Sequence, residues 1–274
     1  MSITQSAYEL LRWYVDAGVD EAIGEIPVDR YAAAARAAAP VRPASPPPTF
    51  HPETAPRPEI GRGTLEQRAP EQRSNAAHLA AECKSLDELY AAIDSFEACP
   101  LKMTARRTVF GDGNPKAQVM LVGEAPGADE DRIGRPFVGV SGQLLDRMLA
   151  SIGLDRSTCY ITNILPWRPP GNRKPSLPEV EMMLPFVERH VELVDPAVML
   201  LLGGAAASAL LARNEPISRL RGRWFDYATP GLQRPVAALA TFHPAFLLRT
   251  PGQKREAWRD FVTLRQKIDF LNIF

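Results

Sequence analysis

Four short apolar runs constrain the fold of this chain more than any other feature of its sequence. They are QVMLV at 118–122, CYITN at 159–163, AVMLLL at 197–202 and VAALA at 236–240. Continuous apolar runs of this length are typical of strands that are buried on both faces of a parallel sheet. Helical patterns lie between them, one from a Ser141 cap to Gly153 and another over 178–193. The sequence therefore predicts a three-layer α/β/α sandwich around a central, mainly parallel four-stranded sheet.

Proline separates this domain from the start of the chain. Eight of the 26 prolines lie between Pro40 and Glu59, and such a segment forms a flexible, partly polyproline linker rather than a core. Apolar residues at helical spacing predict an amphipathic helix within 5–23, which could dock on the domain, bind a protein partner or remain a loose appendage. We divide the chain into an N-terminal helical segment at 1–30, a Pro/Ala-rich linker at 31–75 and the α/β domain at 76–274.

The balance of charged residues excludes a strongly basic protein surface. The chain has 32 Lys and Arg and 32 Asp and Glu, but residues 168–274 hold 15 basic and 10 acidic side chains. An excess of positive charge in one region suits binding of a polyanion, although scattered solvated arginines would give the same count.

Cysteine use and hydropathy indicate a cytoplasmic protein. The three cysteines, Cys83, Cys99 and Cys159, form no CxxC motif, so a disulfide framework is not expected. The N-terminus carries acids within its apolar pattern and lacks a basic leader, and no stretch reaches the roughly 20 apolar residues that span a bilayer. We therefore expect neither an export signal nor a membrane anchor.

Distinctive residues follow all four apolar runs. GEAPG comes after the first run, Asn163 ends the second, Gly203 and Gly204 follow the third, and TFHP follows the fourth. In an open parallel sheet, ligands bind in the crevice beyond the carboxyl ends of the strands. The sequence therefore predicts that four loops converge on one site.

These motifs, in this order, resemble those of a known enzyme family. GEAPGADED with GRPFVG, YITN with RPPGNR, ISRLRGRW, and TFHPAFLLR with KREAW are similar to the family 4 uracil-DNA glycosylases of bacteria and archaea, over roughly residues 95–268. The resemblance implies a DNA repair hydrolase that flips uracil out of DNA, hydrolyses its N-glycosidic bond and leaves an abasic site. The crevice motifs offer no obvious lysine for a Schiff base, so we expect a monofunctional enzyme. We also expect the enzyme to be a monomer.

Two alternatives to this function stay open at the level of sequence. A related glycosylase could prefer another deaminated base such as hypoxanthine, because the shape of the pocket decides the base. The chain could also be a non-catalytic DNA-binding repair scaffold that recruits partners through its N-terminal segment.

The resemblance also assigns roles around the base. It makes Phe137 the aromatic platform and Asn163 the reader of the imide edge of uracil, with Gly123 and Ala125 completing the base pocket, while His243 would stabilise negative charge on the departing base. Each of the three side chains also fits a structural role, as a core Phe, an Asn that closes a strand, or a structural His.

The acidic stretch after the first run supplies the candidate carboxylates. Glu130 is the first choice for stabilising positive charge on the sugar and orienting water, and Glu124 would shape the loop or position water. Asp129 and Asp131 are expected to be solvated or paired with Arg132 and Arg135.

The later loops would contact the DNA backbone. We expect the helix that begins near Gly204 to present free N–H groups, and Leu247 to fill the gap left by the base, unless that leucine is buried in a helix. The remaining expected contacts to DNA come from Arg168, Gly171, Asn172, Arg173 and Arg249.

One departure from the family concerns its 4Fe-4S cluster. Members typically carry four cysteine ligands, but the corresponding positions here are Phe96, Cys99, Trp167 and Met183. Since a cluster normally needs four thiolates, we expect no cluster and no other metal, with an apolar plug around Trp167 and Met183 instead.

Overall fold

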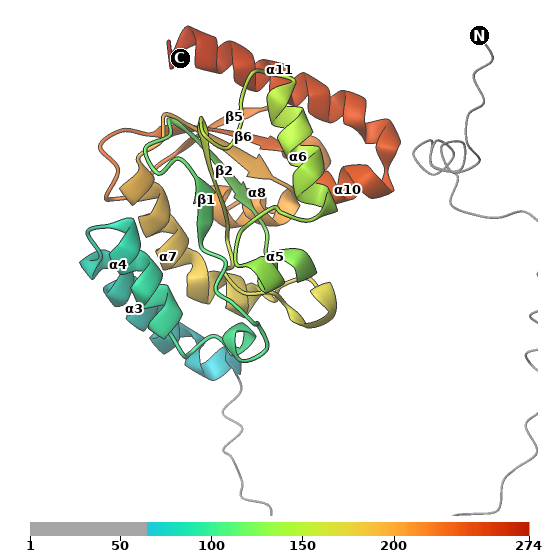
Figure 1. Ribbon diagram of the computed structural model, residues 1–274. Coiled ribbons are helices and arrows are strands. Elements are labelled where there is room, and N and C mark those ends of the chain that lie inside the picture. The colour runs from blue at the N-terminus through green and yellow to red at the C-terminus, as the bar shows by residue number, and fades with distance from the viewer. Residues whose placement is uncertain (1–64, 274) are drawn as a thin grey trace, which may run out of the picture. The chain divides into compact units, whose positions relative to one another are not determined.

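A computed structural model describes residues 65–273 and confirms the predicted α/β class (Figure 1). Four parallel strands form the centre of the sheet, in the order β3 (Cys159–Asn163), β2 (Val119–Gly123), β4 (Val198–Leu202) and β6 (Val236–Thr241). They coincide with the four apolar runs, and nearly all of their residues are buried. The segment at 1–30, for which the sequence predicts a helix, and most of the predicted linker lie outside the described residues.

Two edge strands extend the sheet to six strands, two more than the sequence predicted. β1 (Gly111–Gly113) pairs antiparallel with β3, and β5 (Trp224–Tyr227) pairs antiparallel with β6. The sequence of β1 is GDG, and its two glycines and an aspartate give no strand signal. Pairing with β3 therefore creates β1, whereas the aromatic residues of β5 suit a strand by themselves.

Helices cover both faces of the sheet. On one side, α3 (Leu65–Glu82) and α4 (Leu86–Ser95) pack against α7 (Leu177–Val194), as Figure 1 shows. On the other side lie α6 (Val140–Ala150) and α11 (Lys254–Phe270). The side chains of β2 alternate between two apolar clusters, with Met120 and Val122 in one and Val119 and Leu121 in the other. The sheet is thus the middle layer of the predicted sandwich.

Short helices complete the described fold. They are the 3-10 helices η1 (Pro100–Met103), η2 (Pro170–Asn172) and η3 (Pro251–Gln253), and the α-helices α5 (Ala128–Ile133), α8 (Gly204–Leu211), α9 (Ile217–Leu220) and α10 (Pro244–Arg249). None of the helices in residues 65–273 is both long and apolar enough to cross a membrane.

Two predicted boundaries need correction. The N-cap of α6 is Gly139 rather than the expected Ser141. The carboxylate of Glu130 fixes the backbone there, because it accepts a hydrogen bond from the N–H of Gly139. Helix α3 begins at Leu65, so the linker predicted for 31–75 extends too far towards the C-terminus. The packing of α3 against α7 explains this helix, since its sequence has only weak amphipathic character.

The order of the strands creates a crevice. From β2 the chain moves to β3 on one side and then crosses to β4 on the other side of β2. At such a reversal the connecting loops leave the sheet in opposite directions, which opens a space beyond the carboxyl ends of the strands. The distinctive motifs all begin at this edge.

Candidate active site

A cleft of about 960 Å³ lies beyond the carboxyl ends of the parallel strands. Loops that follow all four of these strands line it. Among the expected site residues, those that line the cleft are Glu124, Ala125, Glu130, Phe137, Asn163, Asn172, Arg173, Gly204, His243 and Arg249. Gly123, Arg168, Gly171 and Leu247 do not form part of its lining.

Asn163 is the last residue of β3, and its side chain is buried in the floor of the cleft. Its Oδ1 atom has no hydrogen-bond partner within the described residues. Gly123 lies opposite it on β2, and a Cβ at Gly123 would lie 2.4 Å from that oxygen. A buried acceptor without a partner costs about 1–3 kcal/mol, so an N–H that reached this oxygen from a ligand would relieve that cost.

Phe137 lies beside Asn163 and lines the same cleft. A Cβ at Gly123 would lie 2.5 Å from its Cζ, so the ring packs directly on the glycine. The ring also tilts against that of His243, with centroids 5.5 Å apart and planes at 31°. Although Phe137 belongs to the core cluster beneath α6, part of its ring reaches the cleft. The core role and the platform role are therefore compatible.

His243 is the N-cap of α10, and this position fixes its tautomer. Its Nδ1 accepts a hydrogen bond of 3.1 Å from the backbone N–H of Ala245, so the proton of the neutral ring is on Nε2. Burial and the nearby positive charge of Arg249 together lower the pKa of His243 to about 4, while the negative charge of Glu130 acts in the opposite direction. The ring is thus a neutral hydrogen-bond donor at neutral pH.

Glu130 is buried, and both of its carboxylate oxygens bind backbone N–H groups. Oε1 accepts from Val138 and Gly139, each at 2.8 Å, and Oε2 accepts from Gly127 at 3.1 Å. Of its acidic neighbours, Asp129 pairs with Arg132 at 3.1 Å and Asp131 accepts from the backbone of Arg106 at 2.7 Å. Glu130 therefore fastens the start of α5 to the loop that carries Phe137.

Glu124 is the carboxylate with free oxygens. It is partly buried in the wall of the cleft, and its side chain makes no hydrogen bond within the described part of the chain. Burial raises the pKa of Glu124, and the positive charge of Lys174 offsets part of that effect. The expectation that Glu130 orients the water therefore needs a correction, because its oxygens are occupied, whereas Glu124 keeps free oxygens in the wall of the cleft.

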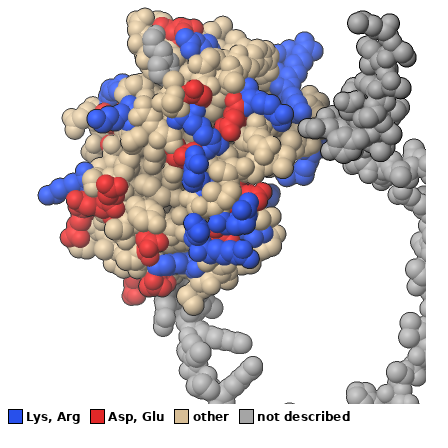
Figure 2. Space-filling model, viewed as in Figure 1, with Lys and Arg blue, Asp and Glu red and all other residues tan. Residues whose placement is uncertain are grey.

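The loop after β3 forms a basic border of the cleft. Figure 2 shows Lys and Arg side chains grouped at the lower right, where α5 and this loop lie in Figure 1, with acidic side chains among them. Arg173 is already bound to Glu179 through two hydrogen bonds of 2.9 and 2.6 Å, and Arg168 donates to Asn172 at 2.7 Å. Lys174 lines the cleft, which corrects the expectation that no lysine is near it.

The expectation for Leu247 needs a correction. This residue is fully buried in a cluster with Leu144 and Phe242, so it cannot enter the DNA stack without leaving the core. The next residue, Leu248, is 37% exposed on the same short helix. Helical geometry places adjacent side chains about 100° apart, so only one of the two leucines can face the core.

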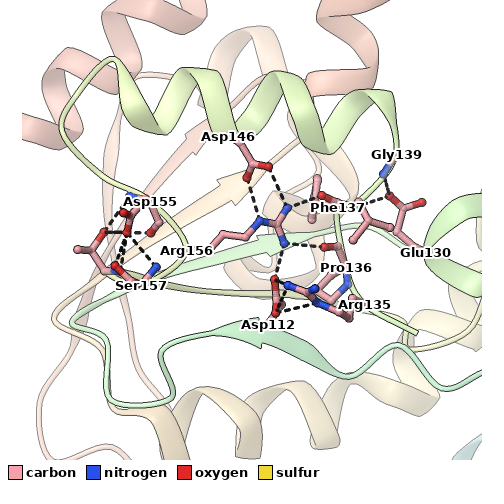
Figure 3. A network of polar contacts seen from close by, with 12 residues as sticks. Asp112, Glu130, Arg135, Pro136, Phe137, Gly139, Asp146, Asp155, Arg156 and Ser157 are labelled. Carbon is pink, nitrogen blue, oxygen red and sulfur yellow. Dashed lines mark hydrogen bonds and ion pairs between the residues drawn. The ribbon is translucent and has the colours of Figure 1, made fainter. Parts of the chain in front are cut away.

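Sequence reasoning missed several residues of the site. Further side chains that line the cleft include Ser141, Lys174, Ser208, Ile217, Phe242 and Phe246. Arg156 lies behind the cleft and binds the backbone of the loop that carries Phe137 (Figure 3). No local signal marks Arg156, because its partners are separated from it by 10 to 44 residues.

The residues at the four cluster positions do not fit an iron-sulfur cluster. Phe96, Cys99, Trp167 and Met183 are all buried in the same apolar cluster. The indole N–H of Trp167 donates to Thr108 at 3.1 Å, and burial raises the pKa of the Cys99 thiol to about 11, which keeps it protonated. Within residues 65–273, no group of three or more His, Cys, Asp or Glu side chains could hold a metal ion.

Comparison with known proteins gives consistent matches. Residues 110–262 match the model of the uracil DNA glycosylase superfamily. The type-4 uracil-DNA glycosylase of Archaeoglobus fulgidus is 42% identical over 182 residues, which are 65% of this chain and 90% of that protein. That of Pyrobaculum aerophilum is 38% identical over 179 residues, 64% of this chain and 90% of that protein. That of Thermotoga maritima is 37% identical over 153 residues, 56% of this chain and 77% of that protein.

The state of His243 gives a testable prediction. Because burial disfavours the imidazolium form, the ring should stay neutral at neutral pH and take up a proton only near pH 4. NMR titration of the imidazole signals can measure this, with the His243→Gln variant identifying the signal by its loss. A titration midpoint near the ordinary histidine value of about 6.5 would contradict the prediction.

Proposed function

This chain belongs to the uracil DNA glycosylase superfamily, and we therefore propose that it excises uracil from DNA in base excision repair. The observation that carries the proposal is the unpartnered Oδ1 of Asn163, buried in the cleft beside the ring of Phe137. An everted pyrimidine would present an N–H to this oxygen and a flat face to this ring.

The side chain of Asn163 distinguishes uracil from cytosine. Its Oδ1 would accept the N3–H of uracil, and its Nδ2 would donate to O4. Cytosine instead presents an acceptor at N3 and a donor at its amino group, so both contacts would be mismatched. Mismatched polar groups in a buried site are left without partners, and this penalty supports rejection of cytosine.

His243 and Glu124 would act on the two sides of the glycosidic bond. As the bond between N1 and C1′ breaks, its electron pair moves into the base, and the Nε2–H of His243 would donate to the oxygen that gains negative charge. A water held by Glu124 would attack C1′ and transfer its proton to the carboxylate. Glu130 would act through the loop that it holds, since its oxygens are already occupied.

DNA would be held by the border of the cleft. Lys174 and Arg249 line it and would contact phosphates flanking the extruded nucleotide, and backbone N–H groups near Gly204 would add a further anion contact. We assign the wedge to Leu248 in place of Leu247, because Leu248 is the exposed leucine of α10.

We further propose that the enzyme is a cytoplasmic monomer without a cofactor. Its three cysteines are unpaired and buried, which suits a reducing compartment. One cleft contains every group to which we assign a role at the base, so a single copy is sufficient. The proposed absence of a cofactor is supported by the side chains of Phe96, Trp167 and Met183, which cannot replace the cysteine ligands at three of the four cluster positions.

The function is tested by uracil excision. Asn163→Ala removes both contacts to the base edge and should slow excision from a uracil-containing oligonucleotide on the order of 10²-fold or more. Cleavage of the abasic product by alkali measures the rate, and substrates with hypoxanthine or cytosine test the choice of base.

Asn114→Ala is the matched control, because the one hydrogen bond of the Asn114 side chain within the described residues is accepted from the backbone N–H of Lys116, in a turn that does not line the cleft. It should leave the rate unchanged. Retained DNA binding by a wild-type chain that excises no base would instead support the scaffold alternative.

The wedge gives a second prediction. Leu248→Ala should slow excision from duplex DNA more than from single-stranded DNA, because only a duplex leaves a gap in the stack. Leu247→Ala should instead destabilise the fold by about 2–5 kcal/mol, as measured by chemical denaturation. An equal effect of Leu248→Ala on both substrates would exclude it as the wedge.

The proposed absence of a cofactor gives a third prediction. Protein purified without oxygen should contain no stoichiometric iron or acid-labile sulfide, and its excision rate should not change after treatment with an iron chelator. Elemental analysis and a visible absorption spectrum check this. About four iron atoms per chain would overturn the proposal.

A further inference from the structure

We propose that Arg156 is a positioning residue for base excision, which holds the backbone around Phe137 so that the ring faces the extruded base. This inference rests on the proposed function. Arg156 does not line the cleft, so any effect on the reaction must pass through the residues that it contacts.

The backbone of Phe137 requires such support. Its φ angle is +53°, in the left-handed region that bulky side chains rarely adopt. The residue lies in the loop at 134–139 between α5 and α6, which we call the Phe137 loop. A conformation of this kind persists only where the surrounding structure holds it.

Arg156 holds the carbonyl side of the Phe137 loop. Its Nη1 donates to the carbonyl of Pro136 at 3.1 Å, and its Nη2 donates to the carbonyl of Phe137. Two carboxylates orient the guanidinium, since Nε donates to Asp146 at 3.0 Å and Nη1 donates to Asp112 at 2.5 Å. Figure 3 shows the guanidinium between these two acids, with the loop carbonyls on its right.

Glu130 holds the amide side of the same loop. Its Oε1 binds the N–H groups of Val138 and Gly139, immediately after the carbonyls that Arg156 binds. Arg156 therefore binds carbonyl groups, and Glu130 binds N–H groups, of the consecutive peptides between residues 136 and 139. Gly142 of α6 permits the close packing, because a Cβ there would lie 1.8 Å from the carbonyl oxygen of Phe137.

Lysine could not replace this arginine. A guanidinium presents its N–H groups in a planar fork that can bind two carbonyls and two carboxylates together, whereas an ammonium is a single point of charge. Loss of the fork would free the two carbonyls and allow the ring of Phe137 to leave its place against Gly123. Misplacement of a substrate-contacting group by about 1 Å can cost on the order of 10²-fold in rate.

A double-mutant cycle tests the inference. Single-turnover uracil excision is measured for the wild type, Arg156→Lys, Phe137→Ala and the double variant, at a temperature where thermal denaturation shows all four to be folded. Arg156→Lys should slow excision by about 10- to 100-fold. In the Phe137→Ala background it should cause no further loss, because the ring through which it acts is already absent.

Arg135→Gln is the matched control. Arg135 binds the same Asp112, through hydrogen bonds of 2.9 to 3.1 Å, but it contacts neither loop carbonyl and is exposed. Although Arg135 lies in the Phe137 loop, its guanidinium is exposed and Asp112 keeps Arg156 as a partner, so Arg135→Gln should change the rate by no more than about twofold. If Arg156→Lys fails to fold, Asp146→Asn is used in the same cycle, since it weakens the orientation of the guanidinium and leaves the fork in place.

The outcomes separate this inference from the proposed function. A wild-type chain that excises no uracil defeats the proposed function, and the positioning role falls with it. An active wild type with an equally active Arg156→Lys variant overturns the inference alone. It is also overturned if the losses of the two single variants multiply in the double variant, because Arg156 would then act independently of the Phe137 ring.

Discussion

The site depends on one close approach, which is possible only because residue 123 has no side chain. Parallel pairing of β2 and β3 places Gly123 opposite Asn163, and the ring of Phe137 packs on the same glycine. Any Cβ at this position would overlap both the amide oxygen and the ring. The sheet register thus brings a hydrogen-bonding edge and an aromatic face together at the floor of the cleft.

Opposite charges behind the cleft maintain this arrangement. Glu130 binds the amides of the Phe137 loop and Arg156 binds its carbonyls, so an uncommon backbone conformation is fixed from both sides. Glu130 and Arg156 thus serve to hold the loop, whereas Glu124 keeps free oxygens and His243 is a neutral hydrogen-bond donor. The charged groups that organise the loop are therefore distinct from those to which we assign the chemistry.

The core beside the site contains an apolar cluster at the four positions where the resemblance would place cluster cysteines. Trp167 and Met183 pack with Phe96 in the layer formed by α3, α4 and α7. Phe96 also makes an edge-to-face contact with Phe186, with ring centroids 5.2 Å apart. Close packing of large side chains supplies the cohesion of this layer, and aromatic pairs add to it beyond the area that they bury.

The sequence by itself determined the sheet centre and the residues at its carboxyl edge, because buried parallel strands require continuous apolar runs and their ends share one side of the sheet. It also indicated Asn163 and His243 through their places at the ends of those runs, and Phe137 through the resemblance to the glycosylase family. Only the tertiary structure decided which glutamate has free oxygens, which leucine of α10 is exposed, and that Arg156 binds the Phe137 loop. These properties depend on contacts between segments that are distant in the sequence, and the residues around each position do not show which atoms those contacts use.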